Sequence, residues 1–225
     1  MISISLSSEC IRNPRCSFCY IEHECKFDVR AIRNSILNAK SNLLDLGVYG
    51  FEYSGYNLIS ISRILEGINT TNVSITTTPD LIDDNILGSN VIDNVALSYN
   101  SEVDIDKWIA AARSILSSGK YLSCNYLVQN IPMNVPRGII KYSNQLNILT
   151  LKPTGVIDDH VLPMLWLELA IVSKHIELCI DNCLAMQMEL ANECHMGTEF
   201  IHILPDGRVI DCSFGGKCNY YVESG

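Results

Sequence analysis

The chain has 225 residues, of which 48% are hydrophobic and 18% are charged, a balance that suits one globular core with a small appendage. Its net charge of −9 argues against a nucleic-acid partner, because broad phosphate-binding surfaces need clustered Lys and Arg. No signal peptide is apparent, and the most apolar stretch, 161–172, is too short to cross a bilayer. We therefore expect a cytoplasmic protein without a membrane partner, and ten cysteines clustered in metal-ligand spacings favour that reducing compartment.

Short β-rich runs alternate with helical periods along most of the chain, which predicts a parallel sheet with crossover helices. Apolar residues at steps of three and four predict a first helix that begins near Val29 and ends at Gly47. A second apolar stripe predicts a helix that begins near Ile105 and ends before Gly119. The expected strands cover residues 2–7, 48–53, 73–77, 95–98, 121–128 and 148–151, with a further strand at 176–180.

The pattern changes beyond residue 180. A cysteine-bearing helical stretch leads into two alternating runs on either side of Pro205-Asp206-Gly207, and these runs predict a β-hairpin. We therefore expect a core over residues 1–182 and a cysteine-rich appendage over residues 183–225.

Three cysteines follow the first predicted strand on one loop: Cys10, Cys16 and Cys19. Three closely spaced thiolates can hold an iron–sulfur cluster whose fourth iron, left without a protein ligand, stays open to a substrate or cofactor. Two cysteines separated by two residues are also common in zinc loops and redox pairs, so these alternatives remain open.

This loop resembles the radical S-adenosylmethionine (radical SAM) superfamily, whose cluster loop follows the first strand of a partial barrel and carries an aromatic residue before the last cysteine. Phe18 fills that position, where it would pack near the adenine, although the first gap between cysteines holds five residues and most members have three. The resemblance implies an α/β fold, a partial (β/α)6 TIM-like barrel with parallel strands. It also implies a [4Fe-4S] cluster that cleaves S-adenosylmethionine with one electron, giving a 5′-deoxyadenosyl radical that abstracts hydrogen from a substrate.

Four other residues match positions where the family contacts S-adenosylmethionine. Ser54 and Gly55 stand where the family has a glycine-rich turn after the second strand, although only one of the expected two glycines is present. A plain strand-to-helix turn capped by Asn57 also explains this string. Ser98 and Asn125, on the fourth and fifth predicted strands, match polar contacts to the ribose and carboxylate of the cofactor. Either residue can instead be satisfied within the sheet.

The appendage contains four more candidate metal ligands, Cys183, Cys194, Cys212 and Cys218. A hairpin that brings Cys212 back near Cys194 can converge these thiolates on one centre. The string resembles the first part of the SPASM or twitch extension of radical SAM enzymes, which implies one auxiliary iron–sulfur cluster. A structural zinc is the alternative, and Cys179 is a spare ligand candidate.

Together these motifs predict a radical SAM enzyme whose substrate the sequence does not name. The extension favours modification of a peptide or protein, with nucleoside or cofactor biosynthesis and a radical activase as alternatives. A non-catalytic zinc or iron–sulfur binding module is the alternative from a different class. The resemblance also implies an electron donor such as flavodoxin or ferredoxin.

Overall fold

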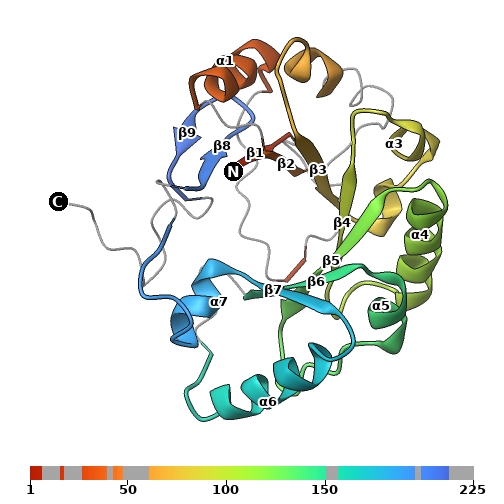
Figure 1. Ribbon diagram of the computed structural model, residues 1–225, viewed down its shortest axis with the longest axis vertical. Coiled ribbons are helices and arrows are strands. Elements are labelled where there is room, and N and C mark those ends of the chain that lie inside the picture. The colour runs from red at the N-terminus through yellow and green to blue at the C-terminus, as the bar shows by residue number, and fades with distance from the viewer. Residues whose placement is uncertain are drawn as a thin grey trace.

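The computed structural model describes residues 1–6, 16–17, 27–39, 43–47, 61–150, 157–195 and 199–212. In this part of the chain, nine strands form one curved, open sheet in the order β7-β6-β5-β4-β3-β2-β1-β8-β9 (Figure 1). All neighbouring strands are parallel except the last pair, β8 and β9. The strands are β1 (Ile2–Ser5), β2 (Leu43–Gly47), β3 (Asn72–Thr77), β4 (Asn94–Tyr99), β5 (Tyr121–Val128), β6 (Gln145–Thr150), β7 (Glu177–Ile180), β8 (Ile201–Ile203) and β9 (Val209–Ile210).

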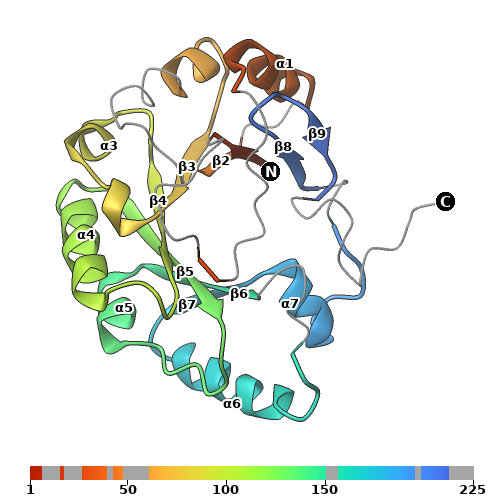
Figure 2. The same cartoon turned by 180° about the vertical axis from the view of Figure 1, so that it is seen from behind.

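Helices lie around the outside of this curved sheet, as both views show (Figures 1 and 2). A mostly parallel, unclosed sheet with helices on its outer side is a partial β/α barrel, so the predicted fold class is confirmed. The described helices are α1 (Val29–Ala39), η1 (Pro79–Leu81), α3 (Asp84–Gly88), α4 (Ile105–Ser117), α5 (Arg137–Tyr142), α6 (Leu162–Val172) and α7 (Asn182–Gln187), with a further helical stretch at residues 61–65. None of them is long and apolar enough to cross a membrane.

The two faces of the sheet differ in chemistry because successive side chains of a strand point to opposite sides. The outer, apolar face packs against buried side chains of α1 and α4, such as Ile36 and Trp108, and each fully buried Leu or Ile contributes about 1.5–3 kcal/mol. The apolar face consists of Ile2, Ile4, Leu44, Leu46, Val73, Ile75, Val95, Leu97, Leu122, Cys124, Leu146 and Ile148. The opposite, polar face has Ser3, Ser5, Asp45, Ser74, Thr76, Ser98, Ser123, Asn125, Asn147 and His202, which share one side by strand register.

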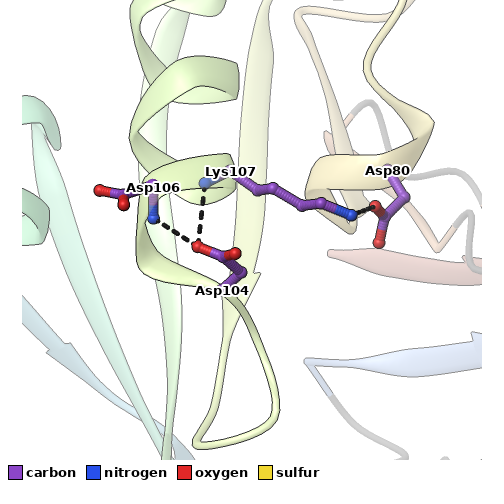
Figure 3. A network of polar contacts seen from close by, with 4 residues as sticks. All are labelled: Asp80, Asp104, Asp106 and Lys107. Atoms are coloured by element: carbon purple, nitrogen blue, oxygen red, sulfur yellow. Dashed lines mark hydrogen bonds and ion pairs between the residues drawn. The ribbon is translucent and has the colours of Figure 1, made fainter.

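Helix α4 shows how the crossover helices are started and fixed. The Asp104 carboxylate caps its first turn by accepting from the backbone N–H groups of Asp106 at 2.8 Å and Lys107 at 3.4 Å (Figure 3). The Lys107 ammonium also lies 3.3 Å from a carboxylate oxygen of Asp80 in η1. This ion pair links the segments that follow β3 and β4, although both side chains are well exposed.

The carboxyl-terminal hairpin docks on the amino-terminal part of the molecule. β8 pairs in parallel with β1, and the turn after β8 contacts α1, where the Ser35 hydroxyl donates to the Gly207 carbonyl at 2.6 Å. Gly207 has a φ of +83°, and a Cβ atom there would lie 2.6 Å from the Ala31 carbonyl carbon and 2.9 Å from the Ile32 nitrogen. Only glycine fits this close approach without a shift of the backbone.

Most of the predicted elements are confirmed, including the hairpin at 205–207, but the first helix was predicted too long. α1 ends at Ala39, and Leu43–Gly47 form β2 instead of a last helical turn. Leu44 and Leu46 alternate with Asp45, and β2 pairs with both β1 and β3, so its burial follows the period of a strand. The strand expected at 48–53 lies outside the described residues. The boundary between core and appendage at residue 182 stays a prediction. β8 lies beyond that residue in the chain and belongs to the same sheet as the core strands.

Candidate functional site

The carboxyl end of β4 holds the described part of the predicted cluster loop. The backbone N–H of Ser17 donates to Glu102 Oε1 at 3.2 Å, and its hydroxyl donates to the same oxygen at 2.8 Å. Cys16, the preceding residue, is half-buried. In β/α barrels the loops at the carboxyl ends of the strands carry the chemistry, so this contact brings Cys16 to the appropriate end of the sheet.

Glu102 itself belongs to a turn that is held by side chains. Its backbone N–H donates to Asn100 Oδ1 at 2.9 Å, and the neighbouring Ser101 N–H donates to Gln129 Oε1 at 2.7 Å. Asn100 is buried, and Gln129 follows directly after β5. These bonds pre-position the carboxylate that accepts from Ser17.

Two of the predicted cofactor contacts lie next to each other on the polar face. Ser98 on β4 and Asn125 on β5 are register partners, and both keep part of their surface exposed. Asn147 on β6 continues the row and donates from Nδ2 to Asn125 Oδ1 at 2.7 Å. Asn147 was missed from the sequence, where its only signal is a polar residue between apolar ones in an alternating strand.

The other half of the polar face holds two titratable groups that the sequence analysis did not single out. Asp45 Oδ1 accepts from the Thr76 hydroxyl at 2.9 Å, and burial raises the pKa of this carboxyl to about 6 although the hydrogen bond from Thr76 lowers it in part. His202 lies 3.0 Å from Ser5 Oγ through Nε2 and 3.3 Å from Ser3 Oγ through Nδ1. Burial lowers the pKa of His202 to about 4, so its ring is neutral at pH 7.

Two tyrosines lie side by side where β4 and β5 end. The rings of Tyr99 and Tyr126 stack with centroids 5.8 Å apart, and the Tyr126 hydroxyl donates to the Met133 carbonyl. Burial, more than the neighbouring Tyr99, raises the pKa of Tyr126 to about 12, so its proton remains available for this bond. The Met133 N–H donates to Glu168 Oε2 at 2.9 Å, which fixes the loop after β5 against α6.

The candidate auxiliary cysteines are spread over elements at both edges of the sheet. Cys183 lies in the first turn of α7, beyond β7, whereas Cys212 is buried just after β9 at the other edge. Cys194 lies between these elements in the chain and is half-buried. Among the described residues, no three His, Cys, Asp or Glu side chains are grouped to hold a metal ion. Other predicted site residues lie outside the described part: Cys10, Phe18, Cys19, Ser54, Gly55 and Cys218.

No protein-family model matches the chain, and no curated protein matches it. Its structure is similar to that of SuiB from Streptococcus suis, determined with S-adenosylmethionine bound, with a TM-score of 0.67 and 14% sequence identity. That similarity covers 94% of this chain and 58% of SuiB, so the chain spans little more than half of that protein. The N-terminal domain of a proposed aldolase from Bacteroides vulgatus is similar with a TM-score of 0.53 and 15% identity, over 90% of this chain and 72% of that one.

These likenesses show the fold. Together with the open parallel sheet, they agree with the partial barrel that the cysteine loop led us to expect. The roles of individual residues rest on the chemistry of the site, because one fold supports many activities.

Proposed function

We propose that this chain is a radical SAM enzyme in which Cys10, Cys16 and Cys19 hold a [4Fe-4S] cluster. The observation that supports the proposal most strongly is the pair of hydrogen bonds from Ser17 to Glu102, because it holds Cys16 and Ser17 just beyond the carboxyl end of β4. The fold shared with SuiB, which was determined with S-adenosylmethionine bound, supports the same cofactor here.

The available donor groups fit this pair of cofactors. Cysteine thiolate is the usual ligand of an iron–sulfur cluster, and the hydroxyl and amide groups on the polar face suit the ribose and carboxylate of S-adenosylmethionine. When bound, the cluster supplies the single electron that cleaves S-adenosylmethionine to a 5′-deoxyadenosyl radical, which abstracts hydrogen from a substrate.

The residues on the polar face would bind and orient S-adenosylmethionine. The bond from Asn147 occupies the Asn125 oxygen, so the Asn125 amide offers its N–H donors, which suit a carboxylate. Ser98, its register partner, offers a hydroxyl that donates to or accepts from a ribose. Phe18, Ser54 and Gly55 complete the proposed contacts on the resemblance alone.

For the substrate, we propose a peptide or protein, on the resemblance of the carboxyl-terminal cysteine string to SPASM or twitch extensions. In this reading Cys183, Cys194, Cys212 and Cys218 hold one auxiliary iron–sulfur cluster, and a flavodoxin or ferredoxin in the cytoplasm supplies electrons. Because the chain spans 58% of SuiB, the activity of a whole peptide-modifying enzyme is itself part of this proposal.

Anaerobic reconstitution with iron and sulfide tests the proposal. We expect the charge-transfer absorption of a four-iron cluster, and release of 5′-deoxyadenosine when reductant and S-adenosylmethionine are added. Cys16→Ala should lose both signals, whereas Cys124→Ala, a matched loss of a buried thiol on the apolar face, should keep them. A colourless protein with stoichiometric zinc would contradict the proposal and favour a zinc-binding module.

The contact to Ser17 can be tested separately. Glu102→Ala removes the acceptor of both hydrogen bonds, and we expect faster loss of iron to a chelator. Glu102→Gln keeps an oxygen acceptor and should retain iron for longer than Glu102→Ala. Equal retention in both variants and the wild type would show that the contact does not support the loop.

The auxiliary site needs its own measurement. A Cys183→Ala, Cys212→Ala double variant should bind less iron than the wild type while still releasing 5′-deoxyadenosine. An unchanged iron count leaves the auxiliary cluster without support.

A further inference from the structure

The half of the polar face formed by β1, β2, β3 and β8 does not include Ser98 and Asn125, which lie on β4 and β5. We propose that Asp45 on this half binds a positively charged amine or guanidinium group of the substrate. This inference rests on the proposed function, because it assigns a substrate class to the same barrel.

Strand register gathers the groups that surround this carboxylate. Ser3 of β1 is the register partner of Asp45 on one side and of His202 on the other, so both titratable residues flank the first strand on one face. On the other side of β2, Ser74 of β3 is the register partner of Asp45, and the Thr76 hydroxyl of β3 donates to the Asp45 carboxylate. Asp45, Ser3 and Ser74 each keep part of their surface accessible, so a ligand group can reach them.

The carboxylate lacks a compensating charge in the described part of the chain. Its hydrogen bond there comes from the neutral Thr76 hydroxyl, and no lysine or arginine of these residues offsets the effect of burial on its pKa. His202 does not compensate it either, since both ring nitrogens contact serine hydroxyls and the buried ring is neutral at pH 7.

A partly buried carboxylate without a cation is unfavourable, because protein surroundings solvate the charge less well than water does. A bound ammonium or guanidinium group would remove this penalty and would form charge-assisted hydrogen bonds with Asp45. The Ser3 hydroxyl would accept a further hydrogen bond from the same cation. The Ser74 hydroxyl, which donates to Asn72 Oδ1 at 3.4 Å and accepts from Asn94 Nδ2 at 3.3 Å, has one further lone pair to offer. The geometry therefore favours a cation over a neutral or anionic group.

The depth of Asp45 also defines where the cation would lie. Asp45 precedes the carboxyl end of β2, at Gly47, by two residues. With a rise of about 3.3 Å per residue, Asp45 lies roughly 7 Å along the strand from the carboxyl edge of the sheet, the edge at which Cys16 and Ser17 are held. A substrate that reacts at this edge would therefore extend its charged group toward the interior on a flexible arm.

Two small probes test the charge preference on the wild-type protein. The pKa of the Asp45 carboxyl is followed by carbon NMR with up to 50 mM N-acetyl-lysine amide or its uncharged isostere, N-acetyl-norleucine amide. We expect the lysine probe to lower this pKa by at least half a unit and the norleucine probe to leave it unchanged. An unmoved pKa with both probes, or an equal shift with both, would overturn the proposal.

Variants then locate the site. Asp45→Asn keeps an oxygen that accepts from Thr76, and we expect it to weaken binding of the lysine probe at least tenfold. Asp106→Asn removes the same charge from the exposed first turn of α4 and should leave binding unchanged. Equal weakening in both variants would mean that the probe responds only to net charge, which would also overturn the proposal.

The failure of this inference can be told apart from the failure of the proposed function. Release of 5′-deoxyadenosine from S-adenosylmethionine by the wild-type protein, with no substrate present, is measured beside its binding of the lysine probe. A wild-type protein that binds the lysine probe but never releases 5′-deoxyadenosine retains a cation site and loses the radical SAM assignment. The reverse result would leave the assignment intact and remove the cation site.

Discussion

The two faces of the sheet are formed by the same strands but carry different kinds of side chain. On the apolar face, Leu97 of β4 is fully buried against the helices, whereas the next residue, Ser98, lies on the polar face and remains partly exposed. Parallel strands are usually apolar on both sides because helices cover both faces. Among the described residues, the helices pack against one side, whereas the other side carries hydrogen-bonding and charged groups, some of them buried, such as Ser123 and His202.

The largest expected effect is on the apolar face. Leu97→Ala should destabilise the protein by about 2–5 kcal/mol, because it removes buried methyl groups and leaves a void. Ser98→Ala, one residue away on the polar face, should change the free energy of unfolding by about 1 kcal/mol or less. Urea unfolding of both variants measures the difference, and equal losses would show that both faces are packed alike.

The second largest effect is expected where the hairpin formed by β8 and β9 docks on α1. Gly207→Ala should destabilise the protein by about 2–4 kcal/mol, because it adds a positive-φ penalty to a clash with the backbone of α1. Gly119→Ala is the matched control, since Gly119 has a φ of +79° but no atom within 4 Å of an added Cβ. Only the conformational penalty of about 1–2 kcal/mol applies there. Thermal and urea unfolding compare the two variants, and equal effects would mean that the hairpin does not press on α1.

A smaller effect should come from Asp45 and depend on pH. Its folded-state pKa of about 6 lies above the ordinary value of 3.8, so its favourable contribution is complete below pH 3.8 and is lost as pH rises through about 6. Asp45→Asn removes this dependence. The variant should therefore gain about 1–3 kcal/mol relative to the wild type between pH 4 and pH 7. A stability difference that stays constant over this range would contradict the burial of a charged group on the polar face.

The smallest effect is expected at an exposed ion pair outside both faces. Lys107→Met should change the free energy of unfolding by about 0.5 kcal/mol or less, because Lys107 and Asp80 are both solvated. Asp104→Ala, which removes the cap of the same helix, should lose about 1 kcal/mol and provides the comparison. A larger loss for Lys107→Met than for Asp104→Ala would show that η1 and α4 depend on their ion pair.

Much of the sheet could be predicted from the sequence because its strands carry local signals. Residues 73–77 and 121–128 alternate and lie between turn residues, and both form strands. β2 was missed because Leu43 continues the spacing of the preceding helix, so the helical pattern ran past the true end at Ala39. Pairing with two neighbouring strands decided the structure there, and such pairing is not visible locally.

The candidate functional site also depends on contacts between residues that are distant in the sequence. Ser98 and Asn125 were predicted as cofactor contacts through a family resemblance, which stays a prediction, and the structure shows that they are register partners. The contact between Ser17 and Glu102 spans 85 positions, and that between Ser3 and His202 spans 199. Contacts at such separations depend on the register of several strands, so no local pattern could predict them.

The pairing of β1 with β8 has a consequence for the order of assembly. Residues 2–4 find one neighbour in the nearby β2, but the other arrives only with residues 201–203. Contacts so distant in sequence form slowly, because a long loop must close first. The strand that leads into the cysteine loop is therefore flanked on both sides only after residues 201–203 have left the ribosome.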